Sequence, residues 1–398
     1  TLSKTVTYEG GEVPTFVNSY AAETEVELQA KKGENAKLGE NEFTFELSGE
    51  GVSERKTVKQ GETATFTAIR YDQDQTGTHT YTIKEIIPEG ADEGNTLDGI
   101  TYDSSEYTVT VEITDNGNGT LSKTVTYEGG EVPTFVNGYA ADGEIDFKGQ
   151  KQIDGRDLTE DDVFTFEVNE VVADDAEGAE EGATKEVLIA VVQNDSTGEI
   201  KYPRIPYTLA DIGTHTYIVK ETSKDGNGII TAKNSYTVTV EVSDNGDGTL
   251  KVVPSDNYDV LDFVNTYNTT TQISLNARKI MKGRKLNEGE FTFTLTGAGV
   301  NQSKIVSKNA ENEYEGTVFF DDLKFAINPT DEQKAEYIDV TDLLDKNGKY
   351  ELKLTVAEDL SKLPKGVVAV PPTSKIVTIT VSYDRATGKL EASSDADM

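Results

Sequence analysis

Lysine, glutamate and asparagine recur at matching positions along the chain, in segments whose pattern predicts β-strands. Alternation of apolar and polar residues over 26–32, 145–151 and 273–279 predicts strands whose terminal lysine lies on the apolar face. The same alternation places a glutamate on the apolar face of a later strand, and an asparagine on the aromatic face of a closing strand. The residues are Lys32, Lys151 and Lys279; Glu85, Glu221 and Glu358; Asn137 and Asn265; and, in the same local sequence near the start, Asn18.

Burial would turn these side chains into reactants. Removal of water disfavours the charged forms, so it lowers the pKa of a lysine and raises that of a glutamate. A neutral lysine amine is a nucleophile, and a protonated carboxylic acid can polarise an amide carbonyl. We therefore expect the lysine to attack the asparagine side-chain carbonyl while the glutamate shuttles protons and ammonia leaves, so that an amide cross-link remains.

Two simpler interpretations compete with the cross-link. A polar residue at the end of a strand commonly lies at the rim and reaches water with its charged end. Alternatively, lysine and glutamate form an ion pair that reacts no further. Recurrence argues against both, because the repeats have diverged over most of their length yet keep a lysine on the first strand and a glutamate on the later one.

An internal repeat organises the chain. Residues 1–18 recur unchanged as residues 120–137, a spacing about the size of a small domain. Period-two segments separated by Gly, Asn and Asp turns predict an all-β fold of tandem Ig-like antiparallel β-sandwiches in series. We expect sandwiches at 19–139, 140–267 and 268–398, with 1–18 as the last strand of a preceding repeat and the third sandwich lacking its closing strand. Two smaller expectations are a short helical turn within 329–337 and a mobile acidic loop at 173–182.

Composition argues against several classes of function. The chain has 37 Lys and Arg against 72 Asp and Glu, a net charge of −35, and no basic cluster suits nucleic acid or an anionic membrane surface. No apolar run reaches the length of a membrane span, and the absence of cysteine removes disulfides and thiolate metal sites. We expect no enzymatic turnover, no cofactor and no metal site, with His79 and His215 in structural roles. The Asp-Asn-Gly segments at 115–119 and 244–248 predict hairpin turns, and a weak cation site is the alternative there.

The pattern resembles a known family of domains. The lysine-bearing first strand, the Phe-Thr-Phe segments (43–45, 164–166 and 291–293), the Tyr-x-x-x-Glu segments (81–85 and 217–221) and the closing Phe-Val-Asn (135–137 and 263–265) resemble the CnaB-type, major-pilin-like isopeptide domains of Gram-positive surface proteins. The resemblance covers nearly the whole chain. It implies a Lys32–Asn137 bond formed with Glu85, and a Lys151–Asn265 bond formed with Glu221. Lys279 and Glu358 match in the third sandwich, but its asparagine is missing.

The resemblance also implies a role. It suggests a stalk or shaft segment of a Gram-positive adhesin or pilus, extracellular and wall-anchored, with the signal peptide and the anchor outside this segment and no membrane insertion within it. Adjacent repeats are the expected partners. The alternative is an adhesin region that binds a host glycan or matrix protein through the insert at 320–345. A further hypothesis is head-to-tail association, in which residues 1–18 of one molecule complete the third sandwich of the next and bond Asn18 to Lys279.

Overall fold

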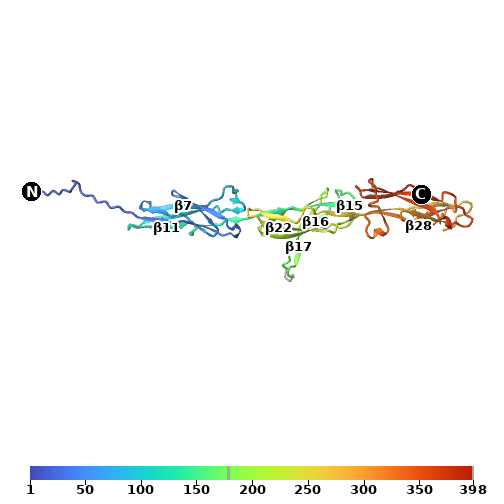
Figure 1. The fold of residues 1–398 in the computed structure, drawn as a ribbon, viewed down its shortest axis with the longest axis horizontal. Coiled ribbons are helices and arrows are strands. Elements are labelled where there is room, and N and C mark those ends of the chain that lie inside the picture. The colour runs from blue at the N-terminus through green and yellow to red at the C-terminus, as the bar shows by residue number, and fades with distance from the viewer. Residues whose placement is uncertain (177–179, 397–398) are drawn as a thin grey trace. The chain divides into compact units, whose positions relative to one another are not determined.

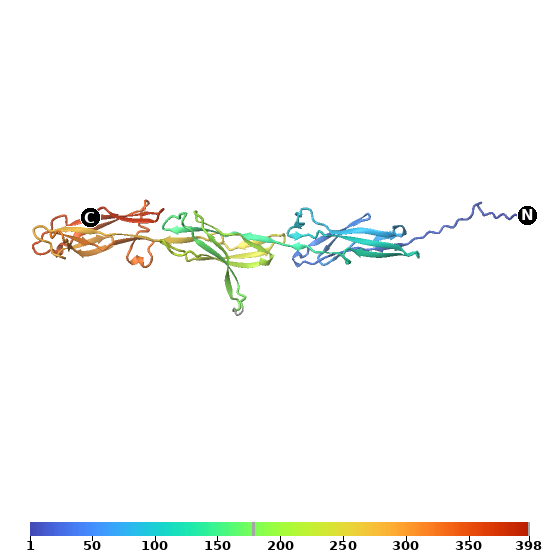
Figure 2. The same ribbon diagram turned by 180° about the vertical axis from the view of Figure 1, so that it is seen from behind.

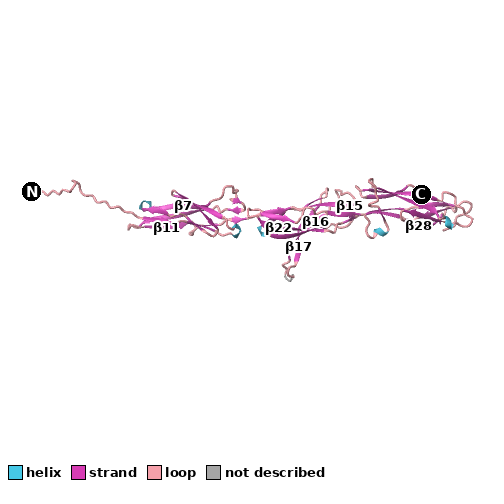
Figure 3. Ribbon diagram, in the orientation of Figure 1, coloured by secondary structure: helices cyan, strands magenta, loops and turns pink. Residues whose placement is uncertain are grey.

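The structure is a computed structural model, and it describes residues 1–176 and 180–396. By their contacts, residues 1–144, 206–213 and 242–252 form one compact unit, and residues 145–205, 214–241 and 253–398 form a second. The fold is all-β, as predicted, and the helical segments among the described residues are single 3₁₀ turns (Figure 3). Part of the acidic segment expected to be a mobile loop, 177–179, lies outside the described residues.

The first sandwich sets a five-stranded sheet, in the order β11-β10-β7-β3-β4, against a three-stranded sheet, β12-β2-β5 (Figure 1). Residues 1–18 precede it as an exposed segment without strand structure (Figure 2). Its elements are β1 (Glu23–Val26), β2 (Gln29–Lys32), η1 (Ala36–Leu38), β3 (Glu42–Gly49), β4 (Val52–Lys59), β5 (Thr63–Thr65), β6 (Ile69–Asp72), η2 (Gln73–Gln75), β7 (Gly77–Glu85), β8 (Thr96–Leu97), β9 (Ile100–Thr101), β10 (Glu106–Asp115), β11 (Leu121–Tyr127), β12 (Thr134–Phe135) and β13 (Gly138–Tyr139).

The second sandwich repeats this plan, with sheets ordered β17-β16-β20-β22-β23 and β18-β15-β24-β21. The expected first strand is divided into β14 and β15, and β15, which carries Lys151, is longer than β2 and continues past the lysine. Its elements are β14 (Asp142–Ile145), β15 (Lys148–Asp154), β16 (Thr165–Ala173), β17 (Thr184–Gln193), β18 (Glu199–Lys201), β19 (Ile205–Thr208), η3 (Leu209–Asp211), β20 (Gly213–Glu221), β21 (Ile229–Ile230), β22 (Ser235–Asp244), β23 (Leu250–Pro254) and β24 (Phe263–Tyr267).

The third sandwich pairs a five-stranded sheet, β28-β27-β33-β34-β35, with the small sheets β26-β30-β29 and β25-β31-β32. The expected helical turn within 329–337 is the short η4. The elements of the third sandwich are β25 (Thr269–Ile273), β26 (Asn276–Ile280), β27 (Thr292–Gly297), β28 (Val300–Ile305), β29 (Ser307–Lys308), β30 (Glu315–Phe319), β31 (Leu323–Ile327), η4 (Gln333–Ala335), β32 (Ile338–Asp339), β33 (Lys349–Glu358), η5 (Leu360–Lys362), β34 (Ser374–Asp384) and β35 (Lys389–Ser394).

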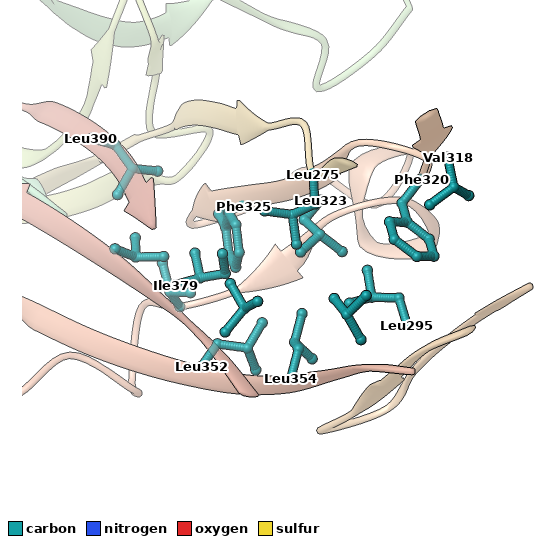
Figure 4. Close-up of a cluster of buried hydrophobic side chains, with 14 of the residues drawn as sticks. Leu275, Leu295, Val318, Phe320, Leu323, Phe325, Leu352, Leu354, Ile379 and Leu390 are labelled. Carbon is teal, nitrogen blue, oxygen red and sulfur yellow. The ribbon is translucent and has the colours of Figure 1, made fainter. Parts of the chain in front are cut away.

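Apolar side chains from facing sheets form the cores. In the third sandwich, Leu352 and Leu354 of β33 and Ile379 of β34 lie opposite Leu275 and Phe325 (Figure 4). All five are at most 2% exposed. At about 25 cal/mol per Å² of apolar surface removed from water, this packing is the main force that holds the two layers together.

The closing strands differ from the predicted antiparallel arrangement. β12 pairs in parallel with β2, and β24 pairs in parallel with β15, whereas β3, β7 and β10 of the first five-stranded sheet, and β16 with β17 and β20 of the second, pair antiparallel. Side-chain alternation shows which face a residue occupies but not which way a neighbouring strand runs, so the sequence could not distinguish the two. Because the first and last strands run the same way, the chain enters each sandwich at one end of this pair and leaves at the other.

The Asp-Asn-Gly segment at 115–119 forms the turn between β10 and β11, as predicted. Gly117 and Gly119 have φ of 70° and 86°, a conformation that glycine adopts without steric cost. Asp115 Oδ1 accepts a hydrogen bond from the backbone N–H of Gly117 at 2.8 Å and another from Tyr20 Oη at 2.7 Å. Among the described residues, no group of three or more His, Cys, Asp or Glu side chains could hold a metal ion.

Candidate cross-linking sites

In the first sandwich, one carboxylate joins the lysine and the asparagine. Lys32 Nζ donates to Glu85 Oε2 at 3.1 Å, and Asn137 Nδ2 donates to Glu85 Oε1 at 2.7 Å. The Lys32 and Glu85 side chains have no exposed surface, and Asn137 is 2% exposed. The structure therefore brings together the three groups that the sequence analysis paired, and it excludes water from them.

Strand register places the three side chains. Lys32 ends β2 opposite Phe135 of β12, and Asn137 follows Phe135 by two residues, which returns it to the same face. Glu85 ends β7 in the facing sheet, opposite Phe45 of β3. The predicted buried face of residues 26–32 is confirmed, because Val26, Leu28, Ala30 and Lys32 are all buried. The expected single strand is instead two, since β1 ends at Val26 and β2 begins at Gln29.

Burial changes the proton affinities in the direction that the chemistry needs. Loss of hydration lowers the pKa of Lys32 and raises the pKa of Glu85, although each group's charge partly offsets the shift of the other. Both shifts make the neutral pair, an amine and a carboxylic acid, more accessible than it is in water. The neutral amine is the form that can attack a carbonyl.

A backbone N–H that the sequence did not suggest binds the carboxamide oxygen. The N–H of Asp103 donates to Asn137 Oδ1 at 3.0 Å, from the segment that links β9 to β10. Negative charge develops on this oxygen when an amine adds to the carbonyl, so a fixed donor here stabilises the tetrahedral intermediate. The Asp103 carboxylate accepts from the N–H of Val136 at 2.9 Å and so fixes the closing strand beside it.

The Phe-Thr-Phe segments have a function that the sequence analysis did not assign. Lys32 Nζ lies 4.4 Å from the centre of the Phe43 ring, and the Phe45 ring packs on Phe135 at 4.9 Å between ring centres. The first phenylalanine thus covers the amine and the second holds the closing strand. The signal was the recurrence of two phenylalanines, two residues apart, in the segment that follows each lysine strand.

The second sandwich repeats the arrangement. Lys151 Nζ donates to Glu221 Oε2 at 3.1 Å, and Asn265 Nδ2 donates to Glu221 Oε1 at 2.9 Å. The Lys151 and Glu221 side chains have no exposed surface, and burial lowers the pKa of Lys151. The backbone N–H of Ala232 donates to Asn265 Oδ1 at 2.7 Å, and the Phe164 ring lies 4.7 Å from Lys151 Nζ.

In the third sandwich, the residues that the structure describes place two of the three groups together. Lys279 Nζ donates to Glu358 Oε1 at 2.5 Å above the Phe291 ring. These side chains are 13% and 8% exposed, in contrast to the fully covered pairs of the other sandwiches. Asn18 lies in the exposed N-terminal segment.

The histidines take part in local hydrogen bonds. His79 Nε2 lies 2.8 Å from the backbone oxygen of Gln75, and His215 Nδ1 lies 2.7 Å from Glu170 Oε1. Neither contact involves the lysine, glutamate or asparagine of a cross-linking site.

The shifted pKa values predict a bell-shaped pH dependence for cross-linking in the first sandwich. The neutral pair and the ion pair both hold one titratable proton, on the Glu85 carboxyl or on the Lys32 amine. At low pH both groups are protonated, and at high pH neither is. The rate of cross-linking therefore falls at both extremes. Because burial raises the pKa of Glu85 and lowers that of Lys32, we expect the two limbs to lie closer together than the titrations of the two free side chains. Dilution of unfolded, unlinked chain into buffers of different pH, with timed mass measurement, gives the profile. A rate that still rises at pH 11 would show that a freely solvated amine reacts.

The sequence was also compared with known families and proteins. The model of the family described as FctA, Spy0128-like isopeptide containing domain, matches residues 28–140, 147–268 and 275–398. A search of curated proteins found no match.

The solved structures to which the chain is similar include a major pilin and a pilus adhesin. The major pilin from Streptococcus pyogenes is 16% identical, with a TM-score of 0.23, over 63% of this chain and 99% of that one. The TIE protein of Bacillus anthracis is 16% identical, with a TM-score of 0.22, over 88% of this chain and 48% of that one. The pilus adhesin SpaC from Lactobacillus rhamnosus GG is 12% identical, with a TM-score of 0.15, over 94% of this chain and 39% of that one.

Proposed function

The chain belongs to the FctA family of Spy0128-like isopeptide-containing domains, and from this we propose that it is a shaft segment of a Gram-positive surface adhesin or pilus, braced by Lys32–Asn137 and Lys151–Asn265 amide bonds. The observation that carries the proposal is the twofold recurrence of a buried carboxyl in contact with both a lysine amine and an asparagine amide. Pilin-like domains are normally displayed outside Gram-positive cells. None of the described helices is long and apolar enough to cross a membrane.

The proposed reaction in the first sandwich begins with a proton transfer from Lys32 to Glu85. The neutral amine adds to Cγ of Asn137, and the Asp103 N–H stabilises the oxyanion. Glu85 then gives its proton to the amide nitrogen and takes a second proton from Nζ, and the Cγ–Nδ2 bond breaks as the carbonyl re-forms. The ammonia leaves with that second proton as ammonium, so Glu85 ends as a carboxylate and Nζ–Cγ is an amide bond. The amine and the amide are held in one dry site, so no encounter in solution is needed.

Each site reacts once in this proposal. The amine and the carboxamide are consumed, and the glutamate is regenerated inside a closed core with no path for a second substrate. Domains of the pilin family are structural, and self-modification of this kind fits a structural module. Glu85 and Glu221 are the proposed proton-transfer residues, and Glu358 holds the corresponding position in the third sandwich.

The bond position suits a module that carries tension. Because β2 and β12 are parallel neighbours, a pull on the two chain ends shears one strand past the other. A Lys32–Asn137 bond would join these two strands covalently and pass the load across them. The segment between them, about a hundred residues, would then carry no force. We propose the same for β15 and β24, with sandwiches bounded at 19–139, 140–267 and 268–398.

The alternative role, ligand binding through the insert at 320–345, has less support. Most of this segment's apolar residues are committed to the core: Leu323, Phe325, Ile327 and Val340 are at most 5% exposed. Its surface contributes an open, shallow hollow, lined by Phe320, Asp321, Asp322, Lys324 and Glu336. The insert is therefore better explained as added packing in the third sandwich.

Peptide mapping tests the proposed bonds. We expect proteolysis of the denatured chain to release a branched peptide in which Lys32 is joined to Asn137, and another in which Lys151 is joined to Asn265. Each branched peptide should weigh one ammonia, about 17 Da, less than its two linear components. Recovery of both lysines in linear peptides alone would refute the proposal.

A further inference from the structure

One residue holds the closing strand of the first sandwich at two places. Asp103, in the segment between β9 and β10, donates its backbone N–H to Asn137 Oδ1 at 3.0 Å, and its Oδ2 accepts the N–H of Val136 at 2.9 Å. Its Oδ1 accepts the N–H of Ser105 at 3.0 Å, which fixes the carboxylate to its own segment. The N–H of Asp103 thus acts on the reacting carboxamide, whereas its carboxylate acts on the backbone just before that carboxamide.

The carboxylate contact lies where the pairing of the closing strand stops. The described pairing of β12 with β2 ends at Phe135, whereas the pairing of β24 with β15 in the second sandwich continues through Asn265. Val136 and Asn137 lie between β12 and β13, and there the backbone oxygen of Asn137 accepts a hydrogen bond from Asn35 Nδ2 at 3.0 Å. The carboxylate therefore binds the closing strand at a residue that the described strand pairing does not hold.

The second sandwich has the N–H but not the carboxylate. Ala232 occupies the position of Asp103, since its backbone N–H donates to Asn265 Oδ1 at 2.7 Å. The acid in residues 222–234, the segment between β20 and β22, is Asp225, and its Oδ1 accepts from Thr231 and Lys233 of the same segment. In this segment, all of which the structure describes, no carboxylate contacts the closing strand β24. The two sites therefore differ at this position by one negative charge and one hydrogen bond.

Asp103 keeps its charge beside the site. Burial alone would raise the pKa of Asp103, but the hydrogen bonds from Ser105 and Val136 and the charge of Lys32 outweigh burial and hold this pKa below its usual value. The side chain is therefore a carboxylate at every pH at which the lysine and the glutamate of the site exchange protons.

This negative charge acts on both reacting groups. The charged groups that face the Lys32 amine are Glu85 and Asp103, and those that face the Glu85 carboxyl are Lys32 and Asp103. Tyr102 also faces Glu85, but burial raises the pKa of Tyr102 and the phenol stays neutral. A neighbouring negative charge raises both pKa values of a coupled pair, so both limbs of the rate profile move to higher pH.

We propose that the Asp103 carboxylate is a positioning group for the first cross-link, without a counterpart at the second, and that its charge raises the pH range in which the first site reacts. By holding the N–H of Val136, the carboxylate keeps the next side chain, Asn137, in contact with Glu85. By its charge, it favours the protonated forms of the reacting pair. The inference rests on the cross-linking chemistry proposed above.

Two substitutions of Asp103 separate its two effects. Unfolded, unlinked chains are diluted into buffers of different pH, and the branched peptides of both sites are measured over time. Asp103→Ala should slow the first bond by about 10- to 100-fold, the loss of one hydrogen bond to a charged group, and should move its rate profile to lower pH. Asp103→Asn keeps an oxygen for the N–H of Val136, so it should recover most of the rate while the profile stays at lower pH. The second bond, formed in the same molecules, should be unchanged in both variants.

A charge control completes the comparison. Glu93→Gln removes an exposed carboxylate from the same connection between β7 and β10, and it should alter neither the rate nor the pH profile of the first bond. A first bond that forms in Asp103→Ala at the unaltered rate and pH would overturn the inference. So would an Asp103→Asn chain as slow as Asp103→Ala with an unmoved pH profile, which would show a structural role alone. In both cases the proposed function stands, whereas absence of both branched peptides from the unaltered chain would overturn the proposed function and this inference together.

Discussion

Lys32→Ala is expected to release roughly 300 Å of extra chain when the protein is pulled from its two ends. Without a Lys32–Asn137 bond, the force reaches the intervening residues, about a hundred in number, and each can extend by ~3.3–3.6 Å. In the unaltered chain, the Lys32–Asn137 and Lys151–Asn265 bonds would carry the load across the first two sandwiches. The third sandwich, in which the described residues place no asparagine beside Lys279, would unfold in every trace and serve as an internal reference.

Single-molecule force spectroscopy makes this comparison directly. The unaltered chain should show one long unfolding event, and the Lys32→Ala chain should show two. Lys31→Ala is the matched control, because Lys31 is the exposed neighbour on the same strand and should leave a single event. Three long events in the unaltered chain would mean that neither bond exists.

Glu85→Gln is expected to keep the shape of the first site and abolish its reaction. The amide can still contact Lys32, but it cannot accept and return the proton, so Asn137 keeps its nitrogen. A bond that closes a loop of about a hundred residues is worth roughly 4–5 kcal/mol in the chain-entropy model. At ~4–8 °C per kcal/mol for a sandwich of this size, the first sandwich should melt on the order of 20 °C lower.

Calorimetry and mass measurement on the same sample test this expectation. The Glu85→Gln chain should retain one ammonia more than the unaltered chain, and only one melting transition should move. Glu112→Gln, at an exposed position of β10, should change neither quantity. An unchanged mass deficit in the Glu85→Gln chain would show that Glu85 does not transfer the proton.

The buried faces of the strands and the residues that make up the sites could be predicted from the sequence, for physical reasons. Alternation with period two fixes the face of each side chain, so Lys32, which ends an apolar face, had to enter the core or its rim. The repeats made the stronger case, since a lysine and a glutamate kept at matching positions predicted the contacts of Lys32 with Glu85 and of Lys151 with Glu221.

Other features depend on tertiary contacts that no local pattern encodes. The parallel pairing of β12 with β2 is set by the path of the chain between them, and β12 itself has only two residues. The donors to the carboxamide oxygens, Asp103 and Ala232, act through backbone N–H groups in irregular segments of unlike sequence. The residue type therefore gave no signal for them.

The mass of the intact, denatured chain is the most direct test of the proposed bonds. Two complete sites should lower it by two ammonias, about 34 Da in total, relative to the mass of the sequence. The deficit should be halved in Lys32→Ala and in Lys151→Ala, once each substitution is allowed for, and abolished when the two are combined. A mass equal to that of the sequence would contradict both bonds at once.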